Sequence, residues 1–75
     1  MNNDLFTLID DGSSVSVIFK KNTIEYASDI SFFNDGFFDA IKEKNVLLQG
    51  RSTVEIYSYA VYWCVRQGCK SISIE

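Results

Sequence analysis

The chain has 75 residues and a formal net charge of −3, with 47% hydrophobic, 15% aromatic and 23% charged residues. This length predicts one small domain with a limited core, and the negative charge argues against general DNA or RNA binding through a basic surface. Without His and with only Cys64 and Cys69 as thiols, the chain lacks the ligands of a structural zinc site. No run is long enough to span a bilayer, no signal peptide is visible, and we expect reduced cysteines.

The first twenty residues predict a β-hairpin. Residues 5–9 form an apolar run, residues 10–14 have the Asp, Gly and Ser composition of a turn, and residues 15–20 alternate in part. Residues 22–26 fit either an extension of the strand or a loop.

A helix is expected next, with Ser28 and Asp29 as candidate caps. Gly36 weakens this helix, so Asn34 or Asp35 is the alternative cap. Apolar side chains recur at helical spacing, and we expect at least the two middle ones in the core: Ile30, Phe33, Phe37 and Ile41.

The second half predicts strand, helix and strand. Residues 46–49 are apolar, residues 52–67 form a helical pattern that Gly68 stops, and residues 71–75 alternate. The order ββαβαβ predicts an α+β sandwich in which two helices pack on one face of one sheet. We expect a single ligand-sensing domain over residues 1–75, with the C-terminal part of a longer chain as an open alternative.

The helix at residues 52–67 is too apolar for a lone small domain. One face can point inward: Val54, Tyr57, Val61, Cys64 and Val65. Tyr59, Tyr62 and Trp63 then point outward and predict a subunit interface, because Tyr and Trp are enriched there. The alternative is aromatic residues scattered on the surface, which are common.

The junction between the third strand and this helix is the sharpest candidate site. A strand that turns at Gly50 and Arg51 into a helix presents free N–H groups and a guanidinium, which attract phosphates. The alternatives are a cap at Ser52 or Thr53, a capping box between Ser52 and Glu55, and pairing of Arg51 with Glu55. The predicted ligand-binding residues are Gln49, Gly50, Arg51, Ser52, Thr53 and Glu55, and Lys20 and Lys21 are either extra positive potential or exposed hairpin lysines.

The succession of an apolar strand (46–49), Gly50-Arg51, an aromatic helix (52–67) and a strand ending in an acid (71–75) resembles the CRISPR-associated Csx-three ring nucleases. The resemblance implies binding of cyclic tetra-adenylate, a second messenger of type III CRISPR defence, between the subunits of an oligomer. The ring nucleases are expected to use a His after the helix and an acid on the next strand. This chain has only the acid, Glu75, which puts cleavage in doubt.

The domain is most similar to the soluble sensor of the Csx-twenty-three membrane effector. This resemblance implies a homotetramer in the cytoplasm, held at the inner face of the membrane by a segment outside this chain. We therefore expect a sensor that binds the ring without cleaving it, with neither cofactor nor metal. The alternatives are a ring nuclease and a protein–protein adaptor that uses the aromatic helix.

Overall fold

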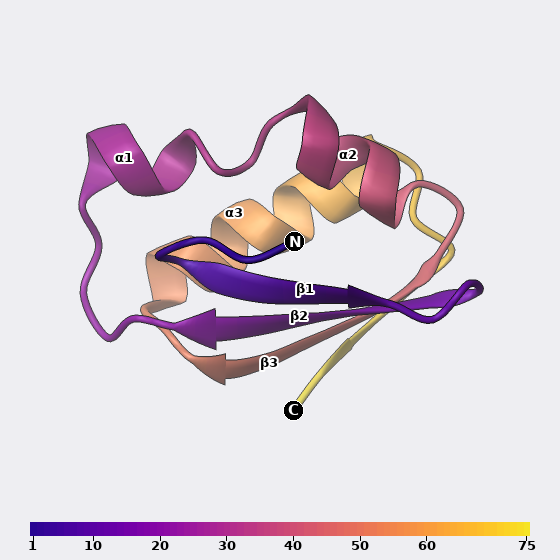
Figure 1. The fold of residues 1–75 in the computed structure, drawn as a ribbon, viewed down its shortest axis with the longest axis horizontal. Coiled ribbons are helices and arrows are strands. Elements are labelled where there is room, and N and C mark those ends of the chain that lie inside the picture. Colours follow the sequence, from indigo (N-terminus) through magenta and orange to yellow (C-terminus); the bar gives the residue numbers. More distant parts are fainter.

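One four-stranded sheet and three helices form two layers in the computed structural model, which describes residues 1–75 (Figure 1). None of the helices has the length and apolarity that crossing a membrane requires. In chain order the elements are β1 (Phe6–Asp10), β2 (Ser14–Lys20), α1 (Tyr26–Ile30), α2 (Asp35–Ile41), β3 (Asn45–Arg51), α3 (Val54–Arg66) and β4 (Ser71–Ile74).

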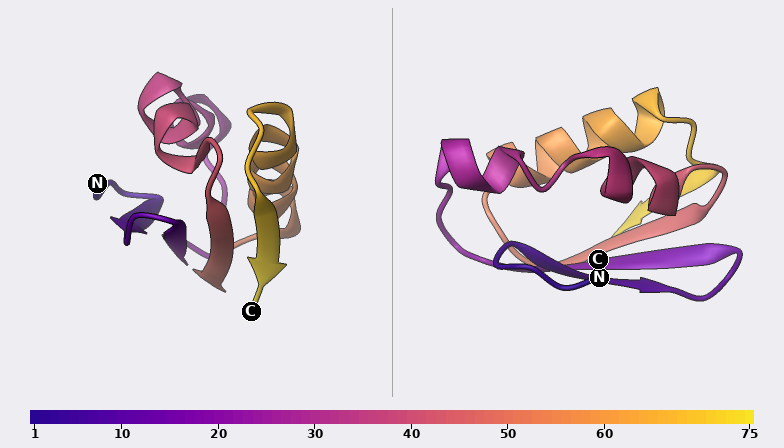
Figure 2. Two further views of the ribbon diagram at one scale, coloured as in Figure 1. Left: turned by 90° about the vertical axis from the view of Figure 1, so that its right-hand side faces the viewer. Right: turned by 45° about the horizontal axis from the view of Figure 1, so that its top comes forward.

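The sheet is mixed, with spatial order β1-β2-β3-β4. β1 and β2 are an antiparallel hairpin, whereas β3 and β4 continue parallel to β2. Parallel neighbours need a crossover, and helices supply both crossovers on the same face of the sheet (Figure 2). β2 and β3 therefore end, and α3 begins, at one edge of the sheet, which we call the carboxyl edge.

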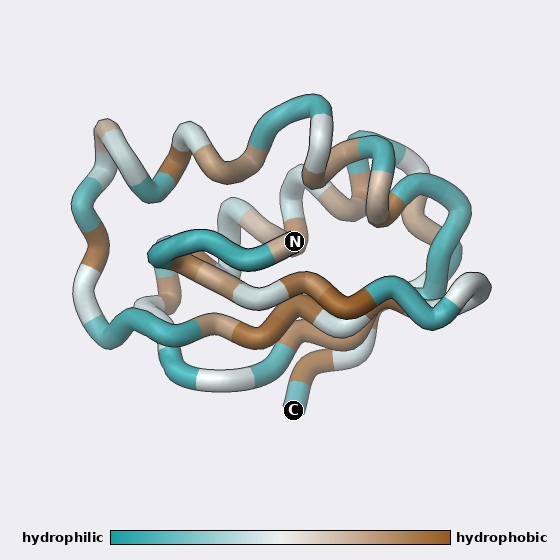
Figure 3. Tube along the Cα trace, viewed as in Figure 1, coloured by the Kyte–Doolittle hydropathy of each residue, from teal (hydrophilic) through white to brown (hydrophobic).

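The core lies between the sheet and the helices. Alternate residues of the strands are buried, as at Val15, Val17 and Phe19 of β2, and the tube of Figure 3 shows apolar stretches along the strands. The ring of Phe6 meets Phe37 of α2 with 5.6 Å between centroids. Phe33 and Phe37 are buried, as predicted, and the other face of the sheet carries no helix.

The predicted α+β class, single sheet and one-sided helical layer are confirmed, but the number of helices is three rather than two. The helix expected from Ser28 to Ile41 is interrupted, because Asn34 starts a new helix. Its side-chain oxygen accepts hydrogen bonds from the N–H groups of Gly36 and Phe37, at 3.1 and 3.4 Å. Asn34 was one of the two alternative caps predicted from the sequence.

The predicted inward face of α3 is wrong at both ends. Val54 and Val65 are 80% and 67% exposed, whereas the buried stripe consists of Ile56, Ala60 and Cys64. The apolar residues of α3 surround the helix, so their spacing did not single out the face that packs on the sheet.

Candidate functional site

Gly50 lies where β3 runs close against the backbone of Phe19 in β2. Its φ is +92°, and a Cβ at this position would lie 2.4 Å from the carbonyl oxygen and 2.8 Å from the nitrogen of Phe19. A side chain therefore cannot fit at Gly50, and the reason is a contact with β2 within the strand, not a turn after it. The Gly50 carbonyl also accepts a hydrogen bond from the Tyr57 hydroxyl, at 2.7 Å, which fixes α3 to the end of β3.

Arg51 is the last residue of β3, so the strand runs two residues beyond the predicted end. It lies opposite Lys20, the last residue of β2, in the parallel register. Arg51 is exposed, and the ion pair with Glu55 that the sequence allowed is not formed. The Lys20 ammonium donates a hydrogen bond to Asn2 Oδ1, at 2.7 Å. The carboxyl edge thus carries two neighbouring cations without acidic partners.

Thr53, rather than Ser52, caps α3. Its Oγ1 accepts a hydrogen bond from the N–H of Ile56, at 3.2 Å. Glu55 is then the second residue of the helix, one place too early for a capping box, so that alternative is wrong. The N–H groups of Val54 and Glu55 have no acceptor within the helix, which leaves them available to an anion.

The remaining predicted site residues spread to either side of Arg51. Gln49 alternates with buried Leu48 and so lies on the sheet face opposite the helices. Glu55 lines a shallow hollow of about 440 Å³ whose other residues include Tyr26, Tyr59 and Tyr62. Ser52 lines a second hollow of about 550 Å³, and its buried Oγ has no hydrogen-bond partner. The structure therefore does not gather the six predicted residues around one hollow.

Sequence reasoning missed the partner of Lys21. The Lys21 ammonium lies 3.0 and 3.2 Å from the two carboxylate oxygens of Asp29, which is fully buried. The same carboxylate accepts a hydrogen bond from the N–H of Glu25, at 2.7 Å, and the bond to Asp29 raises the pKa of Lys21. Lys21 thus holds α1 at the carboxyl edge, and its charge is already paired. The opposite charges of Lys21 and Asp29, near the expected start of the helix, were the only sign of this pair in the sequence.

The predicted interface residues divide into two kinds. Tyr62 is 52% exposed and Tyr59 is 36% exposed on the outer side of α3. Trp63 is half-buried, because its ring packs on Phe38 of α2 with 4.8 Å between centroids. The exposed aromatic surface of α3 consequently consists of the two tyrosines.

The titratable groups of the structure form no group of three or more His, Cys, Asp or Glu that could hold a metal ion. Cys64 and Cys69 are free thiols, and burial, with a smaller effect of Cys69, raises the pKa of Cys64 to about 12. A buried thiol with so high a pKa is a poor nucleophile at neutral pH. Ser52, the hydroxyl nearest Arg51 in sequence, has no hydrogen-bonded base.

Comparison of the chain with protein-family models, with curated proteins and with solved structures gives no match. The residues of the site alone therefore indicate its chemistry. A strand-end arginine, a neighbouring lysine and a helix start can bind an anion, above all a phosphate.

Proposed function

We propose that this domain is a non-enzymatic sensor that binds cyclic tetra-adenylate at the carboxyl edge in type III CRISPR antiviral defence. The observation that carries the proposal is the unpaired, exposed Arg51, which follows the close backbone approach at Gly50 and precedes the start of α3. The resemblance of this strand–Gly-Arg–helix segment to cyclic oligoadenylate-binding domains supplies the ligand class.

The local chemistry supports a phosphate ligand. A guanidinium can donate two parallel hydrogen bonds to one phosphate, and the start of α3 adds unpaired N–H groups and the positive end of the helix dipole. Lys20 adds a second cation opposite Arg51 in the strand register. These groups are exposed, so they need no rearrangement to meet a ligand.

The symmetry of the ligand supports binding by an oligomer. Cyclic tetra-adenylate has four equivalent phosphates, whereas one chain offers one Arg51 at an open edge. Several copies, four in the homotetramer that we propose, would each present one arginine to one phosphate. In this view the domain acts in the cytoplasm, and ligand binding changes how its subunits associate, provided that the two arrangements differ in affinity for the ring.

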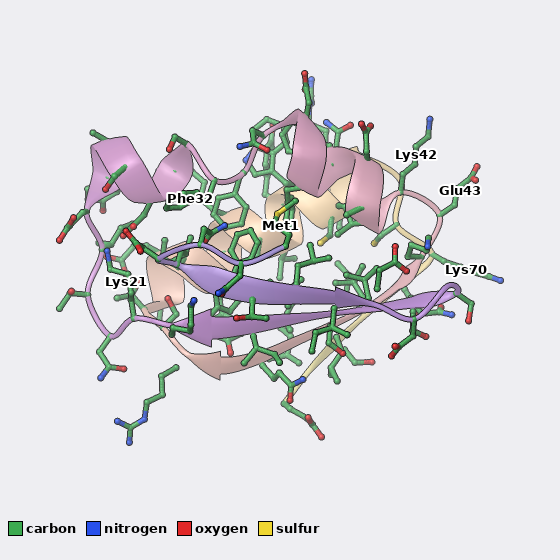
Figure 4. All side chains as sticks on the ribbon, in the orientation of Figure 1. Met1, Lys21, Phe32, Lys42, Glu43 and Lys70 are labelled. Carbon is green, nitrogen blue, oxygen red and sulfur yellow. The ribbon has the colours of Figure 1, made fainter.

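Calorimetric titration with cyclic tetra-adenylate tests the proposal. Replacing Arg51 by Ala is expected to weaken binding at least about tenfold, because hydrogen bonds to a charged group contribute about 1.5–3 kcal/mol. Lys70→Ala is the matched control, since it also removes one exposed positive charge, at the end of the molecule opposite Lys21 (Figure 4). Both variants should retain the helical circular dichroism of the wild type.

Chromatography of the recovered ligand separates the alternatives. Intact ring supports a sensor, and linear products would make the domain a ring nuclease in spite of its missing His. Absence of binding by the wild type, or equal binding by the wild type and Arg51→Ala, would contradict the proposed site. Self-association without affinity for the ring would leave the adaptor as the better function.

A further inference from the structure

The outer side of α3 carries a stripe that is symmetric about its own centre. Glu55, Tyr59, Tyr62 and Arg66 follow one another at spacings of four, three and four residues. These spacings place the four side chains on one face of a helix, and their exposed fractions show that this face does not pack on the sheet. Reversing the helix exchanges the two ends of the stripe and leaves the tyrosines in the middle.

Two exposed valines of α3 lie beside this stripe. Val54 and Val65 each precede one of its charged ends, and they are 80% and 67% exposed. Between Glu55 and Arg66 the helix contains no charged residue at all. A solvated helix face normally carries charged and polar residues, so this face has the composition of a buried one.

We infer that a second copy of this chain packs its α3 antiparallel against this face, across a two-fold axis near residue 60. The axis sets Glu55 against the partner's Arg66 and Tyr59 against the partner's Tyr62. Each contact occurs twice, as in any isologous interface. The occupant is identified by charge complementarity: each acidic end meets a basic end only if the partner carries the same stripe in the opposite direction.

The extent of the surface indicates a reversible pair. α3 has 13 residues and is about 20 Å long, with exposed Tyr26 of α1 and Ile74 of β4 on its flanks. An interface of one helix with such flanks lies at the small end of specific interfaces, so dissociation in the micromolar range is expected.

The pairing does not rest on the ligand proposed above. With the axis near residue 60, the two Arg51 residues lie roughly 25 Å apart, at opposite ends of the pair. Both carboxyl edges stay open in the pair, so pairing leaves each phosphate site accessible to a ligand. Loss of pairing and loss of ligand binding are consequently separate results.

Sedimentation velocity of the ligand-free protein tests this interface with a charge exchange. Glu55→Arg and Arg66→Glu should each weaken dimerisation at least about tenfold, because each sets like charges against one another. The double variant restores both pairs and should recover the dimer. Lys70→Glu is the control for Arg66→Glu, since it makes the same change of charge at an exposed residue beyond the helix.

Arg51→Ala should dimerise like the wild type, which keeps this test independent of the phosphate site. A wild type that stays monomeric through the micromolar range would overturn the inference and leave the face to a different partner. Single variants that dimerise normally, or a double variant that does not recover, would also overturn it.

Discussion

Gly50 and Gly12 have nearly the same backbone conformation, with φ of +92° and +94°, in very different surroundings. A Cβ at Gly12 would meet no atom within 4 Å, whereas one at Gly50 would collide with the backbone of Phe19. Gly12→Ala should therefore lower the free energy of unfolding by only about 1–2 kcal/mol, the cost of the left-handed conformation. Gly50→Ala should lose about 1–3 kcal/mol more, because β2 and β3 must separate. Urea denaturation of both variants measures the difference, and equal losses would contradict the close approach.

A feature of the site could be predicted where residues that are neighbours in sequence determine it. The free N–H groups of the helix start follow from a strand that turns directly into a helix, and the sequence predicted them. The close approach of Gly50 to Phe19 depends on the pairing of β2 with β3, which no local pattern specifies. Whether Thr53 or Ser52 caps α3 is a difference of one residue, and sequence patterns do not locate a helix start that closely. The pairing of Lys21 with Asp29 depends on where α1 packs relative to β2, and no local pattern specifies that position.

Asn34 decides whether the chain between β2 and β3 forms one helix or two. Its side-chain oxygen caps the first turn of α2, and its amide donates a hydrogen bond to the carbonyl of Ser31, at 2.9 Å. Asn34→Ala should lower the free energy of unfolding by about 1 kcal/mol, and Asn34→Asp should lose less because it keeps the acceptor.

Asn22→Ala is the control for the cap, since Asn22 is exposed and its side chain makes no hydrogen bond. Thermal unfolding followed by circular dichroism compares the three variants. Equal stability of Asn34→Ala and Asn22→Ala would show that the cap does not stabilise α2.

Among the elements, the alternation of apolar residues in the strands predicted the core-facing side better than the apolar spacing in the helices did. β2 buries one face only, so its alternating pattern predicts both the strand and the side that faces the core. α3 is apolar on nearly every side, and its buried stripe includes the small Ala60 instead of the larger Val54 or Val65. Which side of such a helix faces the sheet is decided by packing, and the two valines left outside lie beside the proposed dimer face.

The layered arrangement of the whole molecule follows from its order of elements. Two parallel connections made by helices, both of the common right hand, must place those helices on the same face when the strands advance in one direction. The sequence predicted a one-sided sandwich from the order of its elements, and the strand order β1-β2-β3-β4 in the structure explains why both helical connections lie on that side.

A molecule of this size with only 15 of its 75 residues buried should gain stability from association. A partner that binds only the folded chain stabilises it in proportion to the logarithm of partner concentration. The thermal midpoint of the wild type should thus rise by several degrees over about a hundredfold increase in protein concentration that spans the dimer dissociation constant. The Glu55→Arg variant weakens the proposed pairing without touching the core, so its midpoint should rise less than that of the wild type over the same range. Calorimetric scans at matched concentrations make the comparison. A wild-type midpoint that does not change with concentration would show that association does not stabilise the fold.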